Sequence, residues 1–317
     1  MLRRVLLGLS YLFIATSALA QAYPEKPIKV VVPFAPGGGS DIAARALTTK
    51  LAEVLGQPLV IENRGGAGGM VGMEVASKAA PDGYTILIMS DSFPVIAATH
   101  KPAFDPINSL VAVAQVSIAP FGLILHPSVP ASSVSEFIAL ARARPGAFSY
   151  GSSGTGGLTH LITEIFAQQA DVKLVHVPYK STGAALPDFL SGTIQLYVGN
   201  VSPLLPQINA GKLKLLAVTN AERWPLLPNV PTIGETLPGF AADPWFGVFV
   251  PRGTPAPIIE KLNTAINKLL REDELKKSLA GQGMLPQAVT PAVFNDIVRK
   301  DFVRWSKVVA DIGFKPD

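Results

Sequence analysis

The chain lacks cysteine entirely, although it is 317 residues long. This absence excludes disulfide bonds, thiol catalysis, thiolate metal ligands and a lipid anchor on an N-terminal cysteine. Histidine is scarce as well, and the four histidines are too scattered to form a pair at metal-ligand spacing with a carboxylate. They are His100, His126, His160 and His176. We therefore predict no metal and no cofactor.

Charge is also sparse. Charged residues make up only 16% of the chain, and the formal net charge is +4 at pH 7. Two of the positive charges, Arg3 and Arg4, belong to the N-terminal leader, so the remainder is closer to neutral. Such a weak charge gives no basis for nucleic-acid binding. The hydrophobic content of 48% indicates a compact globular protein, and the length suits two lobes better than one core.

Beyond the leader, glycine, proline and charged residues interrupt every apolar run, so no later segment is predicted to span a membrane. The leader combines a basic start, an apolar stretch from Val5 to Ala15 and small residues at Ala18 and Ala20, which is typical of a secretory signal peptide. Its apolar stretch is shorter than the ~20 residues of a spanning helix. We expect cleavage after residue 20, or after residue 22, and a soluble protein in the periplasm that is not a lipoprotein.

Glycine is abundant and gathers in three turns that each follow an apolar run. These turns are Pro36–Asp41, Arg64–Gly69 and Gly151–Gly157. Glycine lets backbone N–H groups converge and a ligand approach closely, and a helix that begins after the turn adds unpaired donors and a partial positive charge. Such turns bind small anions. Together with the export signal, they predict a receptor for a small anion.

Apolar runs alternate with helical patterns in two blocks. Residues 28–33, 59–62 and 84–89 are predicted strands of a βαβαβ unit, which forms a parallel sheet with right-handed crossovers. A second α/β unit begins at Phe121, and a proline-rich connection leads to one more strand near Trp245. We predict two α/β lobes joined by a hinge: a discontinuous first lobe of residues 21–120 and 241–317, and a second lobe of residues 121–240.

Ligands of open parallel sheets bind beyond the carboxyl ends of the strands, so the loops there are the candidate site. The first and third glycine turns best suit a carboxylate, because hydroxyls accompany their N–H groups. Alternatively, the glycines only form tight turns and the hydroxyls only cap helices. Several aromatic residues fall near the predicted cleft edges and would cover the apolar body of a ligand. They are Phe34, Phe93, Tyr179, Trp245 and Phe246.

Nucleotide binding is not supported, because no glycine turn carries the lysine of a P-loop or completes the dinucleotide pattern. A secreted serine hydrolase acting on a small ester or amide is the main enzymatic alternative. Ser153 lies near glycines, but the nucleophile-elbow pattern requires glycine where Thr155 stands. His160 is the candidate base, although it is better explained as a capping or packing residue. Asp41 is better explained as a helix-start residue than as a catalytic acid.

Several segments along the whole mature chain resemble the Bug/TctC family of periplasmic solute-binding proteins, which serve tripartite tricarboxylate transporters. The strongest are Tyr23-Pro24-Glu25-Lys26-Pro27-Ile28, Val32-Pro33-Phe34-Ala35-Pro36-Gly37-Gly38 and Glu62-Asn63-Arg64-Gly65-Gly66-Ala67-Gly68-Gly69. Pro81-Asp82-Gly83-Tyr84-Thr85, Leu227-Pro228-Asn229-Val230-Pro231-Thr232 and Pro251-Arg252-Gly253-Thr254-Pro255 extend the resemblance. It implies the periplasmic binding protein, or Venus-flytrap, fold, in which two hinged α/β lobes close on a carboxylated solute.

The resemblance, together with the glycine turns, gives a set of candidate ligand-binding residues. They are Phe34, Gly37, Gly38, Gly39, Ser40, Asp41, Ser90, Ser152, Ser153, Thr155, Gly156, His160, Tyr179 and Asn200. We expect a monomeric receptor, not an enzyme, that delivers a di-, tri- or aromatic carboxylic acid to membrane subunits of the tripartite tricarboxylate type.

One position departs from the family pattern. Many members carry aspartate before the residue matching Asn200, where this chain has Gly199. A buried ammonium group needs an acidic or otherwise strong acceptor, so the loss of this acid favours a ligand without an amine. Asp41 and Asp243 remain the two alternative ammonium partners.

Overall fold

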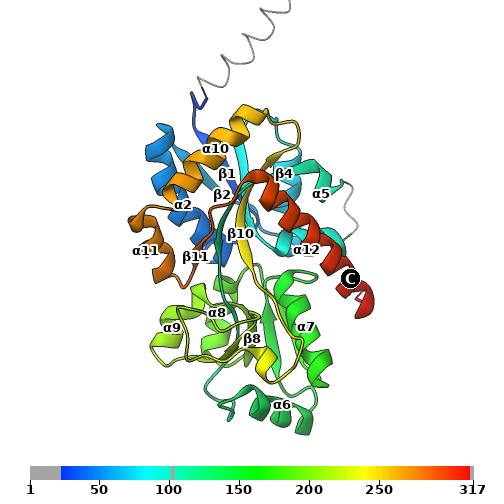
Figure 1. Cartoon of the computed structure of the whole chain (residues 1–317). Coiled ribbons are helices and arrows are strands. Elements are labelled where there is room, and N and C mark those ends of the chain that lie inside the picture. Colours follow the sequence, from blue (N-terminus) through cyan, green and yellow to red (C-terminus); the bar gives the residue numbers. More distant parts are fainter. Residues whose placement is uncertain (1–22, 101–103, 315–317) are drawn as a thin grey trace, which may run out of the picture.

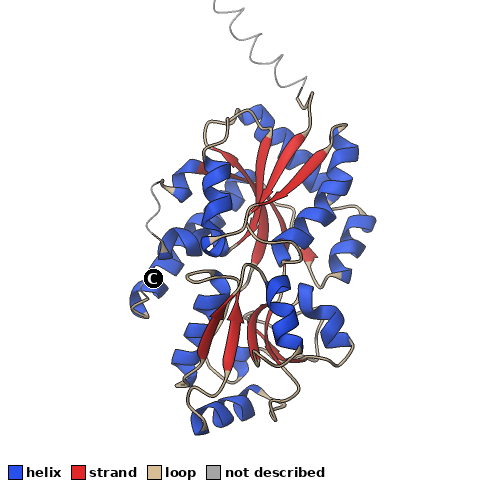
Figure 2. Cartoon of the chain, turned by 180° about the vertical axis from the view of Figure 1, so that it is seen from behind, coloured by secondary structure: helices blue, strands red, loops and turns tan. Residues whose placement is uncertain are grey.

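The computed structural model describes residues 23–100 and 104–314. The predicted signal peptide lies outside these residues. The described chain forms two lobes, each built on one β-sheet with helices packed against it, and the lobes lie one above the other (Figures 1 and 2). The predicted α/β fold with two lobes is therefore observed.

The first lobe contains a mixed six-stranded sheet in the order β11-β4-β10-β3-β1-β2. Its strands are β1 (Ile28–Val32), β2 (Leu59–Asn63), β3 (Thr85–Ser90), β4 (Leu110–Ile118), β10 (Trp245–Pro251) and β11 (Leu285–Pro286). β1 pairs in parallel with β2 and β3, as predicted. β10 pairs antiparallel with β3 and β4, so the complete sheet is mixed and not parallel throughout.

Helices cover both faces of this sheet because its central strands are apolar on both sides. Val30 and Val32 of β1 pack into the cluster under α2, α10 and α11, whereas Val31 packs into the cluster under α3, α4 and α12. The helices are α2 (Gly39–Leu55), α3 (Met70–Ser77), α4 (Ser92–Thr99), α5 (Pro106–Ser109), α10 (Ala256–Leu269), α11 (Asp273–Gly281) and α12 (Pro291–Asp311), with the 3₁₀-helix η1 (Ala67–Gly69) before α3.

The second lobe contains a five-stranded sheet in the order β7-β6-β8-β5-β9. Its strands are β5 (Phe121–Leu125), β6 (Ser149–Ser152), β7 (Val175–Pro178), β8 (Leu196–Asn200) and β9 (Lys214–Val218). Its helices are α6 (Val134–Ala143), α7 (Leu158–Ala170), α8 (Thr182–Leu190) and α9 (Leu205–Asn209), with the 3₁₀-helices η2 (Ser202–Leu204) and η3 (Ile233–Glu235). β6 pairs in parallel with β7 and β8, whereas β5 runs antiparallel to β8 and β9.

The chain passes between the sheets twice, between β4 and β5 and again before β10. The two passages are hydrogen-bonded to each other, because the N–H of Ala119 donates to the carbonyl of Pro244 at 3.0 Å. We propose lobe boundaries at these passages, with residues 121–240 forming the second lobe. The C-terminal helix α12 also links the lobes (Figure 1). Phe294, near its start, packs in the first lobe, whereas Trp305 packs in the main cluster of the second lobe.

Sequence analysis missed three elements between β3 and β5. α4, the short α5 and β4 occupy part of this interval, for which no strand or helix was expected. β4 has the sequence LVAVAQVSI and lies between β10 and β11 with most residues buried, so it shows no apolar–polar alternation. Only Ala119 and Pro120 separate it from β5. α4 is equally buried and has no amphipathic pattern to reveal it.

Candidate functional site

An inner pocket lies where the loops of the two lobes meet. Its free volume is about 30 Å³, which corresponds to about two water molecules. The lining residues are Phe34, Gly38, Gly39, Ser40, Ser90, Ser92, Phe121, Ser153, Thr159, Ser181, Thr182, Asn200 and Phe246. None of these lining residues carries a charged side chain. The described lining therefore consists of hydroxyls, one amide, backbone groups and three phenyl rings.

The starts of four helices meet at this pocket. The first residues of α2 line it with backbone and a hydroxyl, and Ser92, Thr159 and Thr182 lie at the starts of α4, α7 and α8. Each helix start carries about half a positive charge from the aligned peptide dipoles, although Ser92 N of α4 is already bonded to Ser90 Oγ and Ala184 N of α8 to Ser181 Oγ. Four such ends around a pocket without charged side chains create a positive potential suited to an anion.

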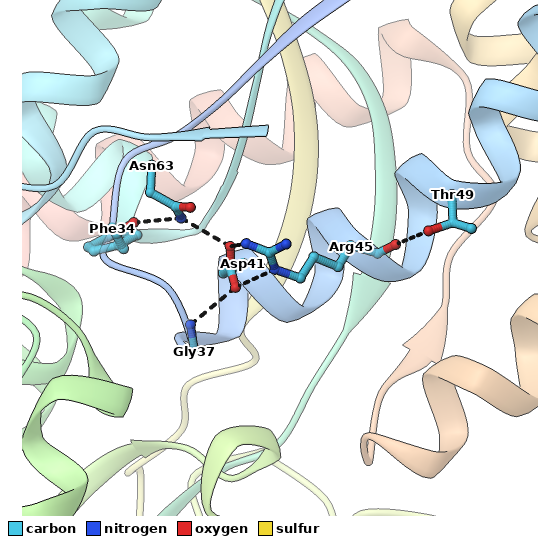
Figure 3. Close-up of polar contacts among 6 residues, drawn as sticks. All are labelled: Phe34, Gly37, Asp41, Arg45, Thr49 and Asn63. Carbon is cyan, nitrogen blue, oxygen red and sulfur yellow. Dashed lines mark hydrogen bonds and ion pairs between the residues drawn. The ribbon is translucent and has the colours of Figure 1, made fainter. Parts of the chain in front are cut away.

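The loop before α2 is held by a hydrogen-bond network centred on Asp41 (Figure 3), which reaches the pocket lining only at Phe34. Asp41 accepts hydrogen bonds from the Arg45 guanidinium at 2.8 and 3.0 Å, from Asn63 Nδ2 at 3.0 Å and from the Gly37 N–H at 3.1 Å. Asn63 also donates to the Phe34 carbonyl at 3.0 Å. Asp41 therefore fixes the loop, and neither Asp41 nor Gly37 lines the pocket.

This network also determines the protonation of Asp41. Burial raises the pKa of its carboxyl, but the hydrogen bonds from Arg45, Asn63 and the Gly37 backbone outweigh burial and hold the pKa below its ordinary value. Asp41 is ionised at neutral pH and its charge is satisfied by Arg45. Within the described residues, the N–H groups of Gly39 and Ser40 have no partner, so they remain available to a ligand.

The loop between β6 and α7 uses its N–H groups differently. Ser153 N donates to Thr159 Oγ1 at 2.8 Å, and Gly154 N donates to Ser152 Oγ at 3.2 Å. Gly156 N donates to His160 Nδ1 at 3.0 Å. The predicted candidates Ser152, Gly156 and His160 therefore hold this loop in shape and do not line the pocket.

Asn200, at the end of β8, is a strong candidate for direct ligand contact. Its side chain is only 3% exposed, and its Oδ1 accepts from Ser202 N at 2.8 Å. Its Nδ2 has no hydrogen-bond partner within the described residues. A Cβ placed on Gly39 would lie 2.4 Å from that nitrogen and 2.9 Å from Phe246 Cζ. Gly39 therefore allows the first lobe to approach an unsatisfied donor of the second.

Residues of both lobes also meet directly beside the pocket. Ala35 N donates to the Lys180 carbonyl at 3.4 Å, and Thr99 Oγ1 donates to the Gly156 carbonyl at 2.9 Å. Close backbone contacts lie at the same seam, because a Cβ on Gly183 would come within 2.9 Å of the Gly37 oxygen. At this seam the two lobes contact each other beside the pocket.

A second, outer pocket adjoins the inner one through two shared residues, Phe34 and Ser153, and has a free volume of about 530 Å³. It is lined by Phe34, Gly66, Ala67, Gly68, Gly69, His100, Ser153, Gly154, Thr155, Pro178, Tyr179 and Lys180. The predicted candidates Thr155 and Tyr179 thus lie in this outer pocket. The Tyr179 hydroxyl donates to Asp188 Oδ2 at 2.7 Å, so the tyrosine offers mainly its ring.

The predicted site residues therefore fall into three groups. Those in the inner pocket are Phe34, Gly38, Gly39, Ser40, Ser90, Ser153 and Asn200; those only in the outer pocket are Thr155 and Tyr179; those in neither are Gly37, Asp41, Ser152, Gly156 and His160. Six inner-pocket residues were absent from the candidate set: Ser92, Phe121, Thr159, Ser181, Thr182 and Phe246. A search for helix-start hydroxyls would have found Ser92, Ser181 and Thr182.

Asp91 lies between the pocket serines Ser90 and Ser92, but it is buried, and its Oδ1 has no partner within the described chain. Burial raises the pKa of Asp91 well above its ordinary value. The nearby carboxylates of Asp301 and Asp243 raise this pKa further, whereas Arg304 lowers it. Asp243 accepts from Asn220 Nδ2 at 3.0 Å and lines neither pocket.

The hydroxyl contacts do not form the Ser153–His160 pair that the hydrolase alternative requires. Ser153 Oγ bonds to Thr159 Oγ1 at 2.9 Å, whereas His160 Nδ1 accepts from Gly156 N. The Ser–His contact that does occur joins Ser152 Oγ to His176 Nε2 at 2.6 Å. Ser152 is 0% exposed, so a substrate carbonyl does not reach its hydroxyl in this conformation.

Residues 23–100 and 104–314 contain no group of three or more histidines and acids placed to hold a metal ion. Over the same ranges, no helix has both the length and the apolar character needed to cross a bilayer.

Comparison with known proteins gives consistent matches. Residues 43–314 match the TctC family, described as the tripartite tricarboxylate transporter family receptor. The chain is 36% identical to Protein BugT of Bordetella pertussis over 319 residues, which cover 98% of each protein. A solved structure of an R. palustris protein with adipate is 34% identical, with a TM-score of 0.89 over 93% of this chain and 100% of that chain.

MatC from Rhodopseudomonas palustris, solved with bound malate, is 32% identical and has a TM-score of 0.85 over 90% of this chain and 100% of that chain. These likenesses extend over both lobes and confirm the periplasmic binding protein fold and the family resemblance predicted from the sequence motifs. The chain belongs to the TctC family of tripartite tricarboxylate transporter receptors.

Proposed function

We propose that this protein is a periplasmic receptor, without catalytic activity, that binds a small carboxylate between its lobes. The convergence of four helix starts on an uncharged inner pocket carries this proposal. Their dipoles attract an anion, the N–H groups of Gly39 and Ser40 at the start of α2 are open to it, and the unpaired Nδ2 of Asn200 adds a neutral donor from the second lobe. The adipate and malate in the related structures support a carboxylate as the ligand.

The lining of the inner pocket contains no acidic side chain, which supports a ligand without an amine. A Cβ on Gly199 would lie 2.4 Å from Tyr197 Cε1 and 2.9 Å from Thr159 Cγ2, so the Tyr197 ring fills the space of an aspartate side chain there. Tyr197 bonds through its hydroxyl to Thr182 Oγ1 at 2.7 Å. Asp41 and Asp243, the two alternative ammonium partners, bond to other residues and line neither pocket, which also supports a ligand without an amine.

Affinity follows from the number of donors. Hydrogen bonds to a charged group contribute about 1.5–3 kcal/mol each. Three or four of them, reduced by the cost of ordering the complex, correspond to a dissociation constant in the micromolar range, about −8 kcal/mol. We expect one binding site per chain.

Calorimetry with the purified mature protein tests the proposal. The panel pairs succinate with aspartate and glutarate with glutamate, and adds malate, adipate and an aromatic acid. We expect micromolar binding of at least one acid and weaker binding of each amino acid than of its amine-free partner. Tighter binding of the amino acids contradicts the amine-free class. If no acid in the panel binds, or if the protein hydrolyses a small ester, the receptor function itself is contradicted.

We further propose that a monomer delivers the acid to membrane subunits of the tripartite tricarboxylate type. Light scattering should give the mass of one mature chain with and without ligand. In vesicles that contain the transporter subunits, the loaded receptor should support uptake of the acid. A dimer, or uptake that does not depend on the receptor, would contradict this part of the proposal.

A further inference from the structure

Two helix starts of the second lobe, those of α7 and α8, contribute to the lining of the inner pocket. Thr159 is the second residue of α7, and Thr182 is the first residue of α8. The influence of a helix dipole falls off within the first turn, so two helix starts stabilise one anion only while both stay close to it. The spacing between Thr159 and Thr182 therefore matters for binding.

One buried side chain connects these two helix starts. Tyr197 of β8 is fully buried and lines neither pocket, and its hydroxyl bonds to Thr182 Oγ1 at 2.7 Å. The Thr159 side chain also interacts with this hydroxyl, and Thr159 Oγ1 accepts from Ser153 N at 2.8 Å. Tyr197 therefore connects α8 with α7 and, through Thr159, with the loop that precedes α7.

Glycines make room for the Tyr197 ring. A Cβ on Gly199, two residues further along β8, would lie 2.4 Å from Tyr197 Cε1 and 2.9 Å from Thr159 Cγ2. A Cβ on Gly151, the partner of Tyr197 on the parallel strand β6, would lie 3.3 Å from Tyr197 Cδ2. The ring therefore extends over Gly199 toward the carboxyl end of β8, and its hydroxyl reaches the helix starts beyond that end.

The Tyr197 hydroxyl is a neutral hydrogen-bonding group. Burial raises the pKa of Tyr197 to about 12, although Thr182 and Thr159 act in the opposite direction, so the hydroxyl stays protonated at neutral pH. A buried tyrosine hydroxyl requires a hydrogen-bond partner. Moving Thr182 away would cost this hydroxyl its bond, so the bond opposes a shift of α8 relative to β8.

Resting on the proposed function, we propose that Tyr197 is a positioning residue for the bound anion. Its hydroxyl holds the starts of α7 and α8 at the spacing that lets both act on one carboxylate, and Tyr197 itself does not contact the ligand. Because the effect passes through Thr182, it should disappear when the Thr182 hydroxyl is removed.

Calorimetry of Tyr197→Phe tests this role with succinate, glutarate, malate and adipate. The ring stays and only the hydroxyl is lost, so we expect the acid that wild type binds most tightly to bind about three- to tenfold more weakly, the effect of one hydrogen bond. A normal affinity in Tyr197→Phe would overturn the proposal.

Tyr23→Phe is the matched control. Tyr23 is also buried, its hydroxyl donates to the Gly83 carbonyl at 2.8 Å, and it lines neither pocket. The control should lower the melting temperature about as much as Tyr197→Phe does, because each loses one buried hydrogen bond, and it should leave affinity unchanged. Equal losses of affinity in the two variants would show that Tyr197 contributes only to general stability.

A double-mutant cycle on affinity separates positioning from general loosening. Thr182→Val should weaken binding, and adding Tyr197→Phe should then change affinity by less than about twofold, because the partner hydroxyl is already gone. Thr182→Ser keeps the hydroxyl, so in that background Tyr197→Phe should have its full effect. If the losses of Tyr197→Phe and Thr182→Val multiply, the role through Thr182 is wrong.

The same cycle measured by urea unfolding needs no ligand. We expect the losses in free energy of unfolding from Tyr197→Phe and Thr182→Val to be less than additive, and additive losses would overturn the connection itself. A wild-type protein that binds none of the four acids would instead contradict the proposed function, and the unfolding cycle would still decide whether the two hydroxyls act together.

Discussion

The glycine-rich loops on either side of the cleft have similar sequences but use their backbones in opposite ways. In the loop Pro36–Asp41, the N–H groups at the start of α2 are open to the pocket, and Asp41 holds the loop from outside. In the loop Ser152–Gly157, the N–H groups of Ser153, Gly154 and Gly156 are already bonded within the loop and its helix. The first loop can donate hydrogen bonds to an anion, whereas the second faces the anion with these N–H groups already bonded.

The difference shows that a glycine-rich turn before a helix indicates an anion site only when its N–H groups lack internal acceptors. Ser152 and His160 supply such acceptors in the second loop, and no corresponding side chain accepts from Gly39 or Ser40 in the first. Four variants test the comparison, in decreasing order of their expected effect on ligand affinity.

Gly39→Ala should have the largest effect. The added methyl would lie 2.4 Å from Asn200 Nδ2, so it would separate the first loop from the second lobe and block the donor. We expect at least a hundredfold loss of affinity by calorimetry, which is about 2.7 kcal/mol or more. The melting temperature should change little, because alanine is favoured over glycine in helices.

Gly281→Ala is the matched control, since a Cβ there meets nothing within 4 Å. It should leave both affinity and melting temperature unchanged. Full binding by Gly39→Ala would show that the start of α2 does not contact the ligand.

Asp41→Asn should weaken binding about tenfold, because loosening the Arg45 and Gly37 contacts lets the donor loop move. The folded-state pKa of Asp41 lies below its unfolded value, so its contribution to stability is present above the unfolded pKa and is lost as pH falls through the folded pKa. Melting curves should show the variant less stable at pH 7 and converging with wild type below about pH 4. A pH-independent difference would contradict the assigned ionisation.

Ser152→Ala should lower the stability of the protein and leave ligand binding nearly unchanged. Its buried hydroxyl bonds to His176 and accepts from Gly154 N, and removing it takes the side-chain acceptor away from Gly154 N and one contact away from His176. We expect about 1–2 kcal/mol of destabilisation, or roughly 2–4 °C in melting temperature, with affinity within about threefold of wild type. A large loss of affinity in a fully stable variant would give the second loop a direct role.

Asp91→Asn tests a buried acid beside a third helix start. Here the pH dependence of stability has the opposite sign to that at Asp41. Burial raises the folded-state pKa of Asp91, so stability is present below the unfolded pKa and is lost as pH rises through the folded pKa. The variant should therefore melt above wild type at pH 7 and equal it near pH 4, with unchanged affinity. A lower melting temperature at pH 7 would show that the Asp91 charge is satisfied.

Some of this site could be predicted from the sequence and some could not. The first loop was found because a strand, a glycine turn and a helix start are adjacent in the chain, so local chemistry identifies Gly38, Gly39 and Ser40. The second loop has the same local signature, and its different use depends on His160 and Thr159 in the following helix. Their side-chain directions are not encoded in the motif.

Pocket residues that come from distant parts of the sequence were harder to predict. Phe246 and Thr182 reach the pocket only because β10 returns to the first sheet and α8 begins beside β8. Asn200 was predicted from the family resemblance alone, since no local pattern distinguishes a ligand-binding asparagine from one that ends a strand. The same limit applies to the fold: the paired strands β1, β2 and β3 were predictable, whereas the fully buried β4 was not.

The contact between Gly183 and Gly37 has a consequence for how long a ligand stays bound. At this point the lobes meet through backbone atoms with no interlocking side chains, so separating them here exposes little apolar surface. Opening at the seam then requires the loss of a few hydrogen bonds, including those from Ala35 and Thr99. At this part of the seam, the bonds that the ligand makes to both lobes therefore contribute most to holding them together, whereas apolar packing between the lobes lies elsewhere, at Val95 and Trp305. A ligand that makes fewer such bonds leaves sooner.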